Sequence, residues 1–249
     1  MLKRRKQTKK KSSIGRNILF ILLMLISLAL IFNSSIRNFI IGLNSNKYQI
    51  TKVTAEEIEE NKQAKTTFDF DQVEAISTEA VLAAQWEAQQ LPVIGGIAVP
   101  ELGINLPIFK GVSNVALMYG AGTMKEAQEM GKGNFALASH HIFAVAGAAD
   151  VLFSPLDRAQ NGMKIYITDK TTVHTYVIDS VQTVTPDSVH VIDDIEGRTE
   201  ITLVTCTDYD ATARIIVKGV LESSTPYRQT SKEILDSFTK SYSQYNYNQ

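Results

Sequence analysis

The sequence predicts a mainly β domain, built as a closed barrel or a sandwich and preceded by one membrane-spanning helix. After Pro92, short β-rich runs alternate with turn residues, and their spacing accommodates seven or eight strands. The membrane helix is indicated by an uncharged stretch over residues 17–36. With 249 residues, 44% of them hydrophobic, the chain is long and apolar enough for one core with appendages, which excludes a wholly disordered protein.

The formal net charge of −1 conceals an uneven distribution of charge. Residues 1–17 carry eight Lys or Arg side chains and no acid, so the remainder holds 17 basic against 26 acidic side chains. An acidic main body argues against nucleic-acid binding. The single Cys excludes an intrachain disulfide framework and any multi-Cys metal centre.

The N-terminal region has the charge pattern of a signal anchor. Its apolar run is about long enough to cross the ~30 Å hydrocarbon core, and the basic cluster precedes it. The positive-inside rule predicts a cytoplasmic tail over residues 1–17, a transmembrane anchor over 18–41, and everything beyond outside the cell. A cleaved signal peptide is the alternative, but the run is long for one and no A-x-A-like site follows. We therefore expect a single-pass protein of the cell membrane.

Residues 42–80 are polar and mixed in charge, which favours an extracellular stalk. The run Thr54-Ala-Glu-Glu57 has the pattern of a capping box and predicts a short helix reaching about Lys65. Ser77 is placed to cap a second helix that continues to about Gln90. The main domain then occupies residues 81–249.

The β-rich runs follow in order within the main domain. The predicted strands are Val93–Val99, Ile104–Phe109, Phe135–His140, Lys164–Thr168, Val173–Val184, Ile201–Cys206 and Arg214–Leu221. Two short helices are expected near residues 116–119 and 155–160. Residues 186–197 form a long Asp-rich connection, a kind of loop that is often functional. The polar tail carries one amphipathic segment at residues 233–238.

The lone Cys206 ends a predicted strand beside an apolar surface, where a side chain is rigidly held yet reachable. A buried structural thiol is the alternative, because free Cys packs like a small hydrophobe. An unpaired thiol in an exported protein nevertheless favours a functional role. Little thiolate exists at neutral pH unless a neighbour shifts or shares the proton, so a nucleophilic Cys206 needs partners.

His140 and Arg214 are the candidate partners of the thiol. His140 ends an apolar strand, as Cys206 does, whereas His174 lies in mid-strand and His190 in the Asp-rich loop. Strand alternation predicts that His140 shares a face with Ala138 and that the adjacent histidine, His141, points the other way. Arg214 follows Cys206 by eight residues across a turn, and its planar donor fork suits an oxyanion or a carbonyl. An ordinary surface Arg on a hairpin is the alternative.

These residues together resemble the sortase family. Thr202-Leu-Val-Thr-Cys206 is similar to the TLxTC signature, Leu137-Ala-Ser-His140 to the strand that ends in the catalytic His, and Arg214 to the essential Arg. The order of the three residues and the N-terminal anchor agree as well. The resemblance covers roughly residues 80–222 and is nearest to the class A, housekeeping sortases of Gram-positive bacteria, in their streptococcal form.

The resemblance implies an eight-stranded β-barrel with short helices and a cysteine transpeptidase. Such an enzyme cleaves a Leu-Pro-x-Thr-Gly signal between Thr and Gly through a Cys206 thioester. It then transfers the secreted protein to an amine of a lipid-linked peptidoglycan precursor. His140 would be the general acid/base, and Arg214 would hold substrate carbonyls. The residues implied to contact the substrate are Ala138, Val204, Thr205, Val189, Val191 and Ile192.

No cofactor is expected. Some class A sortases carry an acidic, calcium-binding insertion before the His strand, but the corresponding residues 131–134 are short and contain no acid. Two other functions stay open at this stage. An extracellular cysteine protease would hydrolyse the thioester, and a membrane-tethered adhesion or wall-binding β-domain would use Cys206 only structurally.

Overall fold

The computed structural model describes residues 14–74, 76–87, 91–143, 148–208 and 210–241, and it divides into two compact units, residues 1–36 and 37–249. The first unit contains α1 (Ile14–Ile31), a helix long and apolar enough to cross a membrane. Most of the expected basic tail lies outside the described residues. The apolar helix ends at Ile31, and residues 37–41 of the expected anchor belong to the second unit, within α2 (Asn33–Lys47).

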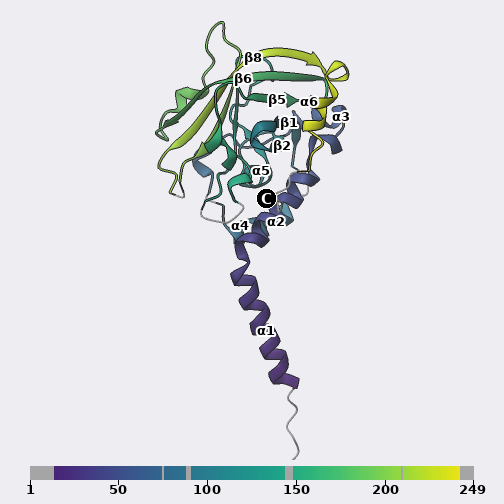
Figure 1. Ribbon diagram of the computed structural model, residues 1–249, viewed down its shortest axis with the longest axis vertical. Helices are drawn as coiled ribbons and strands as arrows, with labels where there is room; N and C mark the ends of the chain where they lie inside the picture. Colours follow the sequence, from purple (N-terminus) through teal and green to yellow (C-terminus); the bar gives the residue numbers. More distant parts are fainter. Residues whose placement is uncertain (1–13, 75, 88–90, 144–147, 209, 242–249) are drawn as a thin grey trace, which may run out of the picture. The chain divides into compact units, whose positions relative to one another are not determined.

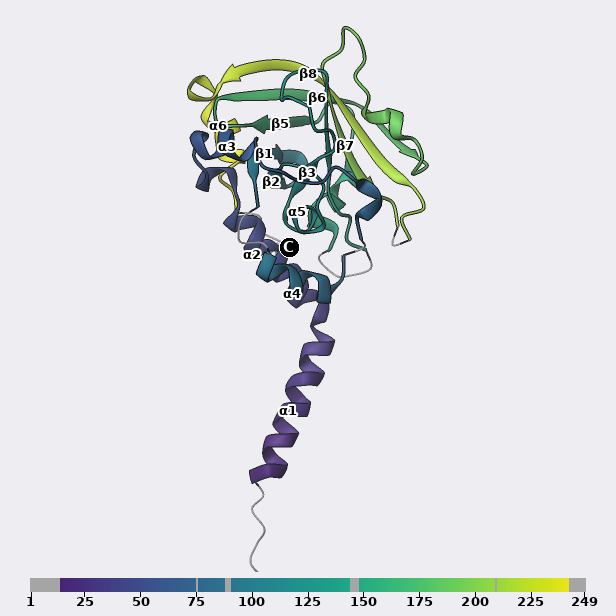
Figure 2. The same ribbon diagram turned by 180° about the vertical axis from the view of Figure 1, so that it is seen from behind.

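The second unit is built around a closed barrel of eight described strands (Figures 1 and 2), which confirms the barrel and not the sandwich. Around the barrel the order is β1-β2-β3-β4-β7-β8-β6-β5. The strands are β1 (Val93–Val99), β2 (Ile104–Phe109), β3 (Ala121–Thr123), β4 (Asn134–Ala138), β5 (Lys164–Thr168), β6 (Thr172–Val184), β7 (Glu200–Cys206) and β8 (Arg214–Pro226).

Short helices accompany these strands, among them α3 (Ala55–Asn61), α4 (Thr78–Glu87), α5 (Asn114–Tyr119), α6 (Lys232–Ser237) and the 3₁₀ helix η6 (Ser154–Arg158). The capping box of α3 is confirmed, because Thr54 and Glu57 exchange both hydrogen bonds expected of it. Ser77 caps α4 by accepting a hydrogen bond from the Ala80 backbone N–H at 3.0 Å.

The segment expected to be a stalk lies against the barrel. Ile50 and Ile58 are buried in one cluster with Ala98 of β1 and Phe238, the residue after α6. Gly96 permits the close approach, since a Cβ there would lie 2.8 Å from an Ile50 methyl carbon. Every residue of β1 is buried, so both faces of this strand are covered. Residues 50–58 therefore form part of the folded unit that contains the barrel.

One strand pairing brings distant parts of the chain together. β4 and β7 run parallel in a register that sets Ala138 opposite Val204, and the Ser139 N–H donates to the Val204 carbonyl at 3.2 Å. Both strands therefore end at the same edge of the barrel. β7 then pairs with β8 antiparallel, with Cys206 opposite Arg214.

Candidate active site

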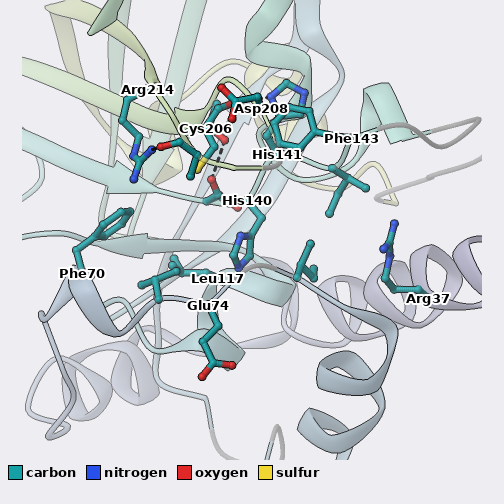
Figure 3. A pocket seen from close by; sticks show the side chains of 16 residues that line it. Arg37, Phe70, Glu74, Leu117, His140, His141, Phe143, Cys206, Asp208 and Arg214 are labelled. Atoms are coloured by element: carbon teal, nitrogen blue, oxygen red, sulfur yellow. Dashed lines mark hydrogen bonds between the residues drawn. The ribbon is translucent and has the colours of Figure 1, made fainter. Parts of the chain in front are cut away.

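The side chains of Cys206, His140 and Arg214 line one cavity of about 140 Å³ at this edge of the barrel. Figure 3 shows the Cys206 sulfur between the Arg214 guanidinium and the His140 ring. The strand pairing explains this meeting, since His140 follows β4, Cys206 ends β7 and Arg214 begins β8. The three predicted residues are thus brought together from parts of the sequence up to 74 positions apart.

Cys206 is a free, half-buried thiol. Burial raises its pKa above the ordinary value, the positive charge of Arg214 lowers it, and Asp208 raises it further. Burial is the largest of these effects. The thiol form therefore predominates at neutral pH, and Arg214 opposes that preference without reversing it.

The His140 side chain is buried, at 8% exposure, and its Nε2 atom has no hydrogen-bond partner among the described residues. Burial lowers the pKa of this imidazole to about 4, so the ring is neutral at pH 7. A buried polar atom without a partner is unfavourable in the free protein. A substrate group that enters the cavity can satisfy it.

His141 lies closer to the site than strand alternation predicts. Its Nδ1 atom lies 2.9 Å from the Cys206 carbonyl oxygen, and its Nε2 atom lies 3.2 Å from an Asp157 carboxylate oxygen. Its ring also stacks on Phe143, with centroids 4.0 Å apart. Because β4 ends at Ala138, alternation does not extend to the two histidines, and both line the cavity. Only the His-His repeat itself could have signalled this contact.

Arg214 is held by the turn that precedes it. Its Nη1 atom donates to the Ala211 carbonyl at 2.7 Å and to the Ala213 carbonyl at 3.1 Å. The Nε and Nη2 atoms have no protein hydrogen-bond partner in the described part of the chain. The guanidinium is thus fixed at one nitrogen while the other two remain available to a ligand.

A second hollow of about 440 Å³, lined mainly by apolar side chains, adjoins the cavity and shares Arg214 with it. Its lining includes four of the residues singled out from the sequence: Val189, Val191, Ile192 and Val204. Ala138 packs in the same apolar cluster as Val191 and Val204. Val189 to Ile192 form the 3₁₀ helix η7, so the long connection folds into one wall of this hollow, which we call the groove.

Thr205 lies on the other face of β7. Its hydroxyl donates to the Ser139 carbonyl at 2.9 Å, and the side chain is buried. Thr205 therefore ties the strand that carries Cys206 to the segment that carries His140, and it borders the cavity rather than the groove.

Phe70 and Val73, from the segment expected to be a stalk, also line both hollows. Hydrogen bonds hold this segment in place: the Val112 N–H donates to the Thr67 backbone carbonyl at 2.9 Å, and the Glu74 N–H donates to the side-chain Oδ1 atom of Asn114, also at 2.9 Å. Neither residue was predicted to belong to the site. The apolar side chains within a polar segment were the available signal.

No group of three or more His, Cys, Asp or Glu side chains suited to a metal occurs in the part of the chain that the structure describes. Beside residues 131–134, the Lys125 ammonium lies 2.6 Å from Asp194 Oδ1. The Asp194 carboxylate, in the 186–197 connection, is therefore paired with a cationic side chain of the protein.

Three comparisons with known proteins agree with this geometry. A sortase-domain family model matches residues 97–222, a range that contains His140, Cys206 and Arg214. The chain is 53% identical to sortase A of Streptococcus agalactiae over 93% of its own length and 94% of that protein's. It is 35% identical to sortase A of Listeria monocytogenes over 82% and 90% of the two chains.

The fold agrees as well. The crystal structure of Listeria monocytogenes sortase A matches with a TM-score of 0.53 and 36% identity, covering 59% of this chain and 96% of that one. A closed barrel that carries Cys, His and Arg at one edge, together with the extent of these matches, gives one conclusion. The chain belongs to the sortase family of transpeptidases, in the class A, streptococcal type.

Proposed function

We propose that this protein attaches secreted proteins bearing a Leu-Pro-x-Thr-Gly signal to an amine of a lipid-linked peptidoglycan precursor. The observation that carries the proposal is the cavity in which Cys206 lies between His140 and Arg214, beside an apolar groove. An apolar groove suits the Leu-Pro part of the signal, and a thiol at its end suits the Thr carbonyl. The resemblance to class A sortases supplies the identity of the signal.

In the first step the Cys206 sulfur attacks the Thr carbonyl carbon and forms a tetrahedral intermediate. Arg214 donates hydrogen bonds to the substrate oxygens, where negative charge develops. His140 donates a proton to the departing Gly nitrogen, the C–N bond breaks, and a thioester remains. The free nitrogens of Arg214 and the unpartnered Nε2 atom of His140 support these roles.

In the second step an amine takes the position that the Gly nitrogen left. His140 removes a proton from the attacking amine, the C–S bond breaks, and Cys206 regains its proton. By microscopic reversibility, the group that protonates the leaving amine is the group that deprotonates the incoming one. The products are a new amide and the free enzyme.

The pKa shifts of Cys206 and His140 decide which protonation state of the pair predominates. Burial raises the pKa of Cys206 and lowers that of His140, so thiol and neutral imidazole are the majority forms at neutral pH. The thiolate–imidazolium form, which can attack and then donate a proton, is a minority that substrate binding must favour.

The apolar helix α1 supports a membrane location for the enzyme. In the proposed topology residues 1–17 are cytoplasmic, the chain crosses once, and the catalytic domain faces the exterior, where secreted proteins and wall precursors meet. The basic residues before α1 support this orientation by the positive-inside rule.

To test this, the full chain in a non-ionic detergent is incubated with a Leu-Pro-x-Thr-Gly peptide and candidate amines. The products are then identified by mass spectrometry. A new amide on the Thr carboxyl, lost in Cys206→Ala, is the expected product, and activity should persist in a metal chelator. Free acid alone would indicate a cysteine protease. No turnover, with Cys206 inert to thiol reagents, would favour a non-enzymatic binding domain.

A further inference from the structure

One buried side-chain amide, that of Asn134, connects three elements of the site. Asn134 begins β4, the strand that leads to His140, and only 1% of it is exposed. Its Nδ2 atom donates to the backbone carbonyls of Val191 and Asp193, each at 3.2 Å. Its Oδ1 atom accepts the Thr202 hydroxyl at 2.8 Å, and Thr202 belongs to β7, the strand that leads to Cys206. The amide therefore uses both donors and its acceptor within the protein.

The backbone around Asn134 receives the same loop. The Asn134 N–H donates to Asp194 Oδ1 at 2.8 Å, and Lys125 contacts the same oxygen at 2.6 Å. Gly133 allows this approach, because a Cβ there would lie 2.8 Å from the Asp194 carboxylate. The 186–197 loop thus packs closely, through Asp194, against Gly133 and Asn134, and hydrogen bonds hold it there.

The residue held by this amide is part of the groove. Val191 is buried, packs with Ala138 and Val204, and lines the groove beside Cys206. If the Val191 carbonyl lost this donor, η7 would be held by its apolar contacts, by the Asp194 contacts with the Asn134 N–H and Lys125, and by a longer contact of 3.5 Å between the Thr202 hydroxyl and the Val191 carbonyl. The width of the groove would then vary, while Cys206 and His140, on other elements, would keep their places.

We infer that Asn134 is a positioning residue for substrate binding: its side-chain amide fixes η7 as the wall of the groove that holds the apolar part of the peptide substrate. The inference rests on the proposed function for the identity of that substrate. Asn134 does not line the cavity of Cys206, so its effect falls on peptide binding rather than on the chemical step.

The test compares Asn134→Asp with the wild type as full chains in detergent. Aspartate keeps the shape and can still accept from Thr202, but it has no N–H to donate to the two carbonyls. The expected result is a KM for the sorting peptide raised about tenfold, the effect of losing a buried hydrogen bond. The value of kcat and the rate of Cys206 alkylation by iodoacetamide should stay within about threefold of the wild type, against the tenfold change in KM. Thr202→Val should raise KM in the same direction by less.

The chain offers a matched control in Asn105, also buried, whose Nδ2 donates to the Lys240 carbonyl at 2.5 Å. Asn105→Asp should leave KM unchanged even where it lowers Tm as much. An unchanged KM in folded Asn134→Asp, or alkylation slowed in step with turnover, would overturn the inference. If the wild type itself turns over no peptide, the proposed function fails. The inference then stands or falls on amide hydrogen exchange at residues 191–194, which should accelerate in Asn134→Asp and not in the control.

Discussion

The burial of His140 predicts a loss of stability in acid that one substitution removes. The imidazole has a pKa of about 4 in the folded protein and an ordinary value of 6.5. Since the folded state holds the neutral form, its stabilisation is fully present above pH 6.5, where both states are neutral. Below that pH the unfolded chain gains a proton that the folded chain does not, so stability falls until the pH passes the folded pKa.

The size of this effect follows from the two pKa values. One pKa unit corresponds to about 1.36 kcal/mol, so the complete loss, below about pH 4, is about 3 kcal/mol. At about pH 4.5 most of it, about 2.5 kcal/mol, is already lost. A loss of this size is a large share of a typical unfolding free energy of about 5–15 kcal/mol.

The assay compares wild type with His140→Gln by thermal or denaturant unfolding at about pH 7.5 and about pH 4.5, a range that spans most of the transition. Glutamine does not titrate, so the wild type should lose about 2.5 kcal/mol more than the variant between the two pH values. His141 and His174 also have lowered pKa values, but they remain in both proteins and cancel in the difference. Cys206→Ala, which keeps His140, should behave like the wild type. Equal losses in wild type and His140→Gln would refute the inference that His140 is buried in its neutral form.

Three further predictions concern the site and its support. Arg214→Lys should lower kcat/KM by about 10²–10³ without lowering Tm, because Lys lacks the planar donor fork; near-normal turnover would reduce Arg214 to a source of positive charge. His141→Ala should lower kcat/KM about tenfold by removing the contact with the Cys206 carbonyl, less than the 10²–10⁴ expected for His140→Ala, and equal losses in steady-state assays would contradict this ranking. Ile58→Ala should destabilise the barrel unit by about 2–5 kcal/mol in denaturant unfolding, since Ile58 is fully buried, whereas no change would show that residues 50–58 are a detached stalk.

Strand positions were predictable because a half-buried or buried strand leaves a local pattern. Val93–Val99, Ile104–Phe109 and Lys164–Thr168 have the same bounds in the sequence analysis and in the structure. β3 was missed because three residues, one of them Gly, are too short to show a period. The apolar pattern predicts an end at Leu221, but β8 continues to Pro226, since its polar end is paired by hydrogen bonds that apolar patterning does not record.

The site was predictable where chemistry is rare in the sequence and not where it depends on packing. A single Cys, a His and an Arg at strand ends have few alternative interpretations. Contacts between residues far apart in the chain place Phe70 in the groove, His141 beside the Cys206 carbonyl and Ile58 on the barrel. The polarity of residues 42–80 favoured a stalk, but a few buried side chains were enough to hold that segment on the domain.

The parallel pairing of β4 with β7 has a consequence for how the protein folds. It joins Asn134 to Glu200, 66 positions along the chain, and the pairing that closes the barrel joins Gly96 to Thr168, 72 positions apart. Loop-closure entropy opposes such contacts until they form, so folding times of milliseconds to seconds are typical of this topology. The β4–β7 ladder is the pairing that brings Cys206 and His140 to the same edge of the barrel. A chain that has not yet formed this ladder therefore carries the thiol apart from His140, and the appearance of activity during refolding reports completion of the barrel.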